Sequence, residues 1–245
     1  PKSLLPQWYK NLTLVYPDYS VGVLSLEFYE GRGGEQKTRN LSLEDMTRRL
    51  RNFQAGEYDV GLIHYDALPR TTVDPSSLEP LVENTPSIQK AAAKRVEYLQ
   101  KKQERERKKA PKDRQQLTER EEAIAEGKLE EWLAEAIEPA HDPVPGITWD
   151  DLGVDLLVVD EAQNYKNLHM PAASRELGVP KYMGNAGKGS KRAWDLFVRA
   201  DVVRRRHNGA IVLLSATPAK NSPLEFYSLY DLIDPGIWQQ RGIYN

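Results

Sequence analysis

The chain has 245 residues and a mass of 27.9 kDa, enough for one large domain or two small ones. Its 34 Lys and Arg nearly balance 36 Asp and Glu, which excludes global basicity as a basis for nucleic-acid binding. The lack of Cys excludes disulfides, Cys-ligated zinc, iron–sulfur clusters and thiol catalysis, and is compatible with a reducing, intracellular setting. No apolar run approaches the roughly 20 residues that span a bilayer, and the start has no signal-peptide organisation. Because it also lacks an initial Met, we expect an excerpt of a longer protein.

Short apolar runs alternate with helical patterns along most of the chain. In chain order, strands are predicted at 12–15, 21–28, 60–64, 155–159 and 210–214, with covering helices at 43–53 and 191–206. The runs at 155–159 (DLLVV) and 210–214 (AIVLL) have almost no polar interruption, as expected for strands covered on both faces of a parallel sheet. This alternation predicts the α/β class, with a doubly wound parallel sheet and helices on both faces.

A strongly charged stretch interrupts this pattern. Residues 94–114 hold ten Lys or Arg against four Asp or Glu, and residues 115–138 hold two against eight. The stretch is rich in good helix formers and predicts two helices with a break near Pro111, paired as an antiparallel hairpin by their opposite charges. Two interpretations stay open, a solvated helical insertion and a nucleic-acid or partner contact through the basic half. The predicted organisation is 1–84 and 139–245 as two parts of one lobe, with the insertion at 85–138 between them.

Two strand ends carry the candidate chemistry. After the run at 155–159 come Asp160, Glu161, Ala162 and Gln163, and after the run at 210–214 come Ser215, Ala216, Thr217 and Pro218. At the carboxyl end of a strand, one carboxylate can hold Mg²⁺ and its neighbour can deprotonate an attacking water. Short hydroxyl residues on the next strand can hydrogen-bond to those carboxylates. Each pattern alone also fits an ordinary exposed turn; together, about 50 residues apart, they favour one shared edge.

With these motifs, the chain resembles the Swi/Snf-like branch of superfamily 2 DNA helicases and translocases. DEAQ (160–163) is similar to the magnesium-and-water motif of that superfamily, and SATP (215–218) to its coupling motif. PKSLLPQW (1–8) with YPDYSVGVLSL (16–26), and YDVGLIHYDAL (58–68), resemble the DNA-facing segments of the branch. The run SKRAWDLF, the pair Asn221-Ser222 and the closing RGIYN resemble helicase modules of large phage or plasmid methylase–helicase proteins.

The resemblance implies a fold, cofactors and partners. The fold is the first RecA-like lobe of a motor that uses ATP and Mg²⁺, acts on DNA, chiefly double-stranded, and closes against a second RecA-like lobe. A cytoplasmic location, in a bacterial or phage-infected cell, is expected, with no membrane partner. The phosphate loop would lie before Pro1 and the second lobe after Asn245, so this segment alone is expected to lack ATPase activity.

The resemblance also implies roles for individual residues. Asp160 would bind Mg²⁺, Glu161 would be the general base, and Gln163 would sense the γ-phosphate or link the lobes. Coupling of nucleotide state to DNA contact would fall to Ser215, Ala216 and Thr217. DNA contact would involve Lys2, Ser3, His64, Tyr65 and Lys166. Structural alternatives stay open for His64 as a buried, satisfied group, for Lys166 with Asn167 as a helix start, and for Trp8, Trp194 and Trp238 as core or interface aromatics.

Two Gly-rich segments come close to a phosphate loop. Residues 31–38 (GRGGEQKT) differ from G-x-x-x-x-G-K-[ST] by Gln36, whose side chain would obstruct the approach of backbone amides to phosphate. We interpret this segment as a Gly-rich turn, and GKGS at 187–190 as a flexible loop.

Besides the motor, a second function stays open: a catalytically idle RecA-like lobe that serves as a DNA- or protein-binding scaffold.

Overall fold

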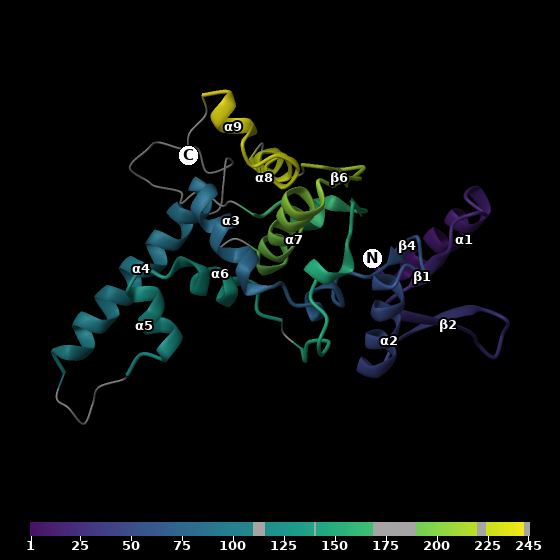
Figure 1. Ribbon diagram of the computed structural model, residues 1–245, viewed down its shortest axis with the longest axis horizontal. Helices are drawn as coiled ribbons and strands as arrows, with labels where there is room; N and C mark the ends of the chain where they lie inside the picture. The colour runs from purple at the N-terminus through teal and green to yellow at the C-terminus, as the bar shows by residue number, and fades with distance from the viewer. Residues whose placement is uncertain (110–115, 140, 169–189, 220–223, 243–245) are drawn as a thin grey trace. The chain divides into compact units, whose positions relative to one another are not determined.

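The computed structural model describes residues 1–109, 116–139, 141–168, 190–219 and 224–242 (Figure 1). The chain divides into two compact units, which we describe one at a time. The first comprises Pro1–Val73, Pro139–Ala162 and Val202–Thr217; the second comprises Asp74–Glu138, Gln163–Asp201 and Pro218–Asn245. None of the described helices combines the length and apolar content needed to cross a bilayer.

The strands of the first unit confirm the α/β class. Two pairs are parallel, β1 (Val21–Val23) with β4 (Val60–Leu62) and β5 (Leu156–Val159) with β6 (Ala210–Leu213). A third pair, β2 (Leu26–Glu30) with β3 (Gln36–Asn40), is antiparallel. Three two-stranded sheets are therefore present among the described residues, where the sequence predicted one parallel sheet.

Two helices pack against β1. The short 3₁₀ helix η1 (Lys2–Leu4) runs directly into α1 (Leu5–Val15), and α2 (Leu43–Gln54) lies close to the predicted 43–53. Leu5 of α1 joins Val23 and Leu26 in a buried apolar cluster. The hydroxyl of Ser42 caps α2 by accepting the Asp45 N–H at 3.0 Å, which explains why this helix begins where the sequence predicts.

Two predicted strands are wrong. Residues 12–15 belong to the end of α1, where the short apolar run LTLV imitates a strand although the spacing of Leu5, Trp8 and Leu12 fits a helix. The single strand predicted at 21–28 is divided into β1 and β2, which belong to different sheets. The chain changes partner at Ser25, a buried residue whose hydroxyl accepts the His64 N–H.

The strands at 155–159 and 210–214 form as predicted, but in the part of the chain that the structure describes one face of each strand is exposed. Val159 is buried, whereas Leu156 is 53 % exposed and Val158 is 45 % exposed. Successive residues of a strand point to opposite faces, so the exposed pair lies on one side of β5. The continuous apolar runs therefore predicted the two strands correctly, but the expectation that both faces of these strands are buried is wrong.

The Gly-rich segment at 31–38 is a hairpin turn, as interpreted. The Gly31 N–H donates to the Glu35 carbonyl at 2.8 Å, and Gly34 has a φ of +75°, which glycine adopts without strain. Lys37 lies in β3 and pairs with Glu35. Because the turn leads into a strand and not into a helix N-terminus, it lacks the geometry of a phosphate loop.

The second unit contains the charged hairpin. Its helices here are α3 (Leu78–Asn84), α4 (Pro86–Arg107), α5 (Glu119–Ala125) and α6 (Leu129–Ile137). Lys102 of α4 pairs with Glu121 and Arg95 pairs with Glu135, both at 2.9 Å, so the basic and acidic halves run antiparallel as predicted. Leu99 and Ile124 form a fully buried contact between them.

One predicted helix of this hairpin is wrong, because the acidic half consists of two helices. The break falls at Gly127, whose φ of +98° no continuing helix can have. The predicted break at Pro111 lies outside the described residues. Residues 78–84, just before the charged hairpin, form the helix α3.

The remaining helices are α7 (Lys191–His207), α8 (Leu224–Ile233) and α9 (Ile237–Gln240), and α7 agrees with the predicted 191–206. Trp194 of α7 is buried against Trp132 and Phe197, so its interpretation as a core aromatic is confirmed. Trp238 stacks on Tyr227 at 4.7 Å between ring centroids. The pair Asn221-Ser222, most of the loop at 187–190 and the last three residues of RGIYN lie outside the described residues.

Candidate functional site

The two predicted motifs meet at one edge of the first unit. In the parallel pair of β5 with β6, Val159 is in register with Leu213, so both strands end side by side. Beyond the ladder, Leu214 donates to the Val159 carbonyl and Ala162 donates to the Leu214 carbonyl, each at 2.9 Å. We call the residues that follow these ends, Asp160, Glu161, Ser215, Ala216 and Thr217, the β5–β6 edge.

Asp160 is held by three hydrogen bonds. The Trp8 indole N–H donates to its Oδ2 at 2.8 Å, and the Glu161 backbone N–H donates to its Oδ1 at 2.9 Å. The Tyr65 hydroxyl donates to the backbone carbonyl of Asp160 at 2.5 Å. Carboxylates that accept N–H bonds are fixed in orientation, so Asp160 presents a defined carboxylate plane at the β5–β6 edge.

Glu161 has a backbone conformation that is uncommon for its type. Its φ is +52°, in the left-handed region that costs a residue with a Cβ about 1–2 kcal/mol. This turn is what brings the N–H of Ala162 back to the Leu214 carbonyl. Such strain at a strand end is typical of functional positions, where the surrounding contacts hold it in place.

The hydroxyl side of the edge is a tight turn. The Ser215 Oγ accepts the Thr217 N–H at 3.2 Å, while Ala216 and Thr217 are exposed. Serine in this arrangement stabilises the turn locally.

Four of the five predicted DNA-facing residues belong to the first unit, where three lie near the surface and one is buried. Lys2 and Ser3 are exposed on η1, and Tyr65 is partly buried in the turn after β4. His64 is only 5 % exposed, and its Nδ1 accepts the Ala67 N–H at 3.2 Å. The structure therefore favours the structural alternative for His64.

Burial lowers the pKa of His64 below its ordinary value of 6.5; nearby Asp66 opposes this shift and Lys2 adds to it. The folded state thus binds fewer protons than the unfolded state just below pH 6.5, and stability falls as the pH drops through that window. We expect the urea midpoint of the wild type to decrease more between pH 7.5 and pH 5.5 than that of His64→Asn, which keeps an acceptor for Ala67 but does not titrate. An equal decrease in both proteins would show that folding does not lower the pKa of His64.

Two further predicted site residues belong to the second unit. Gln163 lies in the 3₁₀ helix η6 (Ala162–Tyr165), and its carbonyl accepts the Lys166 N–H. The Lys166 ammonium pairs with Glu225 at 2.8 Å, with side chains only 15 % and 7 % exposed. The alternative of a helix start at Asn167 extends beyond the described residues.

Comparison with known proteins identifies the family to which the chain belongs. The family described as "Probable helicase domain" matches residues 36–245, most of the chain. The chain belongs to this family. The helicase domain is also 30 % identical over 98 residues to "Defense against restriction protein B" of Escherichia phage P1, across 39 % of this chain and 4 % of that protein. It therefore spans only a small part of the length of that relative, and no solved structure matches it.

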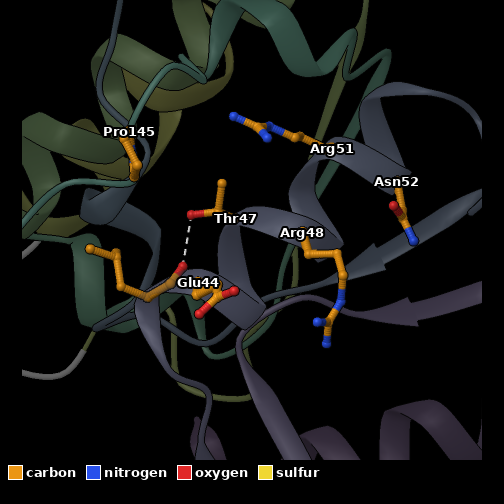
Figure 2. Close-up of a pocket in the computed structure, with 7 residues that line it drawn as sticks. Glu44, Thr47, Arg48, Arg51, Asn52 and Pro145 are labelled. Carbon is orange, nitrogen blue, oxygen red and sulfur yellow. Dashed lines mark hydrogen bonds between the residues drawn. The ribbon is translucent and has the colours of Figure 1, made fainter.

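The first unit of the helicase domain also has a cavity of about 640 Å³ on α2. Its lining residues come mostly from one face of that helix: Leu43, Glu44, Thr47, Arg48, Arg51, Asn52 and Pro145. In Figure 2 the Arg51 side chain extends toward Pro145, whereas Arg48 points away from it, consistent with its ion pair to Asp45. None of the lining residues is a predicted site residue, and the cavity is separate in sequence from the β5–β6 edge.

Trp8 is a residue of the first unit whose contact with the candidate site the sequence interpretation missed. It was interpreted as a core or interface aromatic, yet its indole N–H is bonded to the candidate metal-binding carboxylate. The two residues are 152 positions apart, and no local pattern signals such a contact. Its place within PKSLLPQW, next to the predicted DNA-facing residues, was the one available indication.

Proposed function

We propose that this helicase domain is part of an ATP-dependent DNA helicase or translocase of the Swi/Snf-like branch of superfamily 2, as most of its first RecA-like lobe. The observation that supports this most is the parallel pairing of β5 with β6, which gathers two carboxylates and two hydroxyls at one strand-end edge. In α/β proteins, ligands bind outside the carboxyl ends of parallel strands.

Asp160 is the residue suited to magnesium. Magnesium prefers oxygen ligands and is often held by one or two carboxylates together with the substrate phosphates. Each oxygen of Asp160 accepts one hydrogen bond and keeps a second lone pair for a metal or its water. Among the described residues no group of three or more His, Asp or Glu could hold a metal ion. A magnesium ion at this edge would therefore take most of its ligands from phosphates and water. When bound, Mg²⁺ would neutralise charge on the phosphates of ATP.

Glu161 would act on the attacking water. It follows Asp160 at the same strand end, and its left-handed φ of 52° turns the main chain away from the direction of β5. A general base needs to reach the water while its neighbour serves the metal, and two adjacent residues after a strand can divide these tasks. Gln163, in η6, would contact the γ-phosphate or the second RecA-like lobe.

The remaining residues would connect hydrolysis to DNA. Ser215, Ala216 and Thr217 would transmit the nucleotide state, because their turn is joined to Asp160 and Glu161 through the β5–β6 pair. Exposed Lys2 and Ser3 and the turn carrying Tyr65 would contact the backbone of double-stranded DNA. Lys166 would contribute its charge only after exchanging Glu225 for a phosphate. We place this activity in the cytoplasm.

One observation favours the second candidate function, an idle lobe that serves as a binding scaffold. Both Asp160 oxygens already accept a protein hydrogen bond, as they would in a purely structural role. The test is ATP hydrolysis by the full-length protein with and without duplex DNA. The motor predicts magnesium-dependent turnover that DNA stimulates. DNA binding without any turnover would contradict the motor and support the scaffold.

A further inference from the structure

Two segments that are far apart in the sequence converge on Asp160. Trp8, from the first half of α1, reaches the Oδ2 atom, and Tyr65, from the turn after β4, reaches the backbone carbonyl. The three residues belong to the first unit. Each segment also carries residues that we propose to contact DNA, so the two candidate DNA contacts share a single partner at the β5–β6 edge.

The link between Lys2 and Trp8 is short and continuous. The helix η1 passes into α1 without a break. Leu5, the first residue of α1, is buried in the cluster with Val23 and Leu26. Trp8 follows Ser3 by five positions in the helix, roughly 8 Å along the axis. Because η1 passes directly into α1, a displacement of η1 would be carried along the helix to the residue that bears the indole.

The link through Tyr65 is equally well fixed. The neighbouring His64 is buried, donates its backbone N–H to Ser25 and accepts the Ala67 N–H at its ring nitrogen. The first bond ties the turn to Ser25, which follows β1, and the second braces the turn internally. The hydroxyl of Tyr65 then ties that turn to the last carbonyl before Glu161.

We propose that Trp8 and Tyr65 are positioning residues that couple DNA bound at η1 and at the turn after β4 to the orientation of the Asp160 carboxylate. The inference rests on the proposed function and names a route for its regulation. Trp8 fixes the plane of the carboxylate and Tyr65 fixes the main chain that carries it. A shift of either DNA-facing segment changes which lone pairs Asp160 presents.

Trp8→Phe tests the indole contact, because it removes the N–H and keeps an aromatic ring. In the full-length protein we expect the magnesium concentration for half-maximal ATP hydrolysis to rise roughly 10- to 100-fold, as for other residues that orient a metal ligand. The rate should recover at high magnesium. Tyr65→Phe, which removes only the hydroxyl, should change the magnesium requirement in the same direction.

Trp238→Phe is the matched control, because the buried Nε1 of Trp238 has no hydrogen-bond partner among the described residues. It should leave the magnesium requirement unchanged. A rate that falls equally at all magnesium concentrations in Trp8→Phe would overturn the proposal, since it would indicate a purely structural role.

A second measurement uses the full chain and needs no hydrolysis. The chain has five Trp, and the indole N–H resonance of Trp8 is the one that Trp8→Phe removes. Duplex DNA, added without nucleotide, should shift that resonance. If DNA shifts the amides of Lys2 and Ser3 but leaves the Trp8 indole unchanged, the coupling is refuted and the proposed function stands. If DNA does not bind at all, the proposed function fails, and the coupling fails with it.

Discussion

Replacing Glu161 by Gln in the full-length protein is expected to abolish ATP hydrolysis and to leave ATP binding largely intact. The change removes the carboxylate that would deprotonate the attacking water and keeps the size of the side chain. A positioned general base contributes roughly 10²- to 10⁴-fold to rate, so a decrease in kcat of at least about 100-fold follows. The measurements are steady-state phosphate release with duplex DNA and equilibrium binding of a fluorescent ATP analogue.

Glu104→Gln is the control for this substitution, because Glu104 is exposed on α4 and far in sequence from the β5–β6 edge. It should leave both measurements unchanged. If Glu161→Gln retains DNA-stimulated hydrolysis, Glu161 is not the base. If it loses nucleotide binding as well, the substitution has disturbed the strained turn at φ +52° and not only the chemistry.

Gly209→Ala is expected to destabilise the first unit by about 3 kcal/mol. A Cβ on Gly209 would lie 2.4 Å from the Asp155 carbonyl oxygen and 2.6 Å from a Val203 methyl carbon. That carbonyl accepts the Ala210 N–H at 2.8 Å, the hydrogen bond at which β5 and β6 begin to pair. Because the clash is with backbone, it cannot be relieved by a side-chain rotation, and overpacking adds to the weakened bond. Urea denaturation followed by circular dichroism measures the loss.

Gly33→Ala is the matched control. No atom lies within 4 Å of a Cβ at this position in the hairpin turn, so its effect should stay within about 0.5 kcal/mol. Equal stability of the two variants would mean that β5 and β6 are not packed at Gly209 as described, and the β5–β6 edge would lose its structural support.

The sequence was most informative where local chemistry decides the structure. The strands β5 and β6 and the helices α2 and α7 have nearly the predicted bounds, because apolar runs and a Ser42 cap define them. The charged hairpin was predictable because opposite charges on its halves pair across it, as Lys102 does with Glu121. The meeting of the two motifs followed from one rule, that parallel strands end on the same side.

Prediction failed where distant contacts decide the structure. The run LTLV has the composition of a strand, yet it completes α1, in which Leu5 is anchored to β1 and β2. The bend at Ser25 depends on His64, 39 residues later. The bond between Trp8 and Asp160 crosses most of the chain, so neither residue type nor spacing could have predicted it.

The central claim, that Mg²⁺ and ATP bind at the β5–β6 edge, is tested most directly by metal-directed cleavage of the full-length protein. With Fe²⁺ in place of Mg²⁺, and with ATP, hydrogen peroxide and ascorbate present, the bound iron reduces the peroxide to hydroxyl radicals, which cut the main chain nearby, and ascorbate returns the iron to Fe²⁺. Mass spectrometry should then locate cuts both around Asp160 and Glu161 and around 215–217, and Asp160→Ala should remove both sets. Cuts at only one of these segments, or at neither while ATP is bound, would contradict a metal site at this edge.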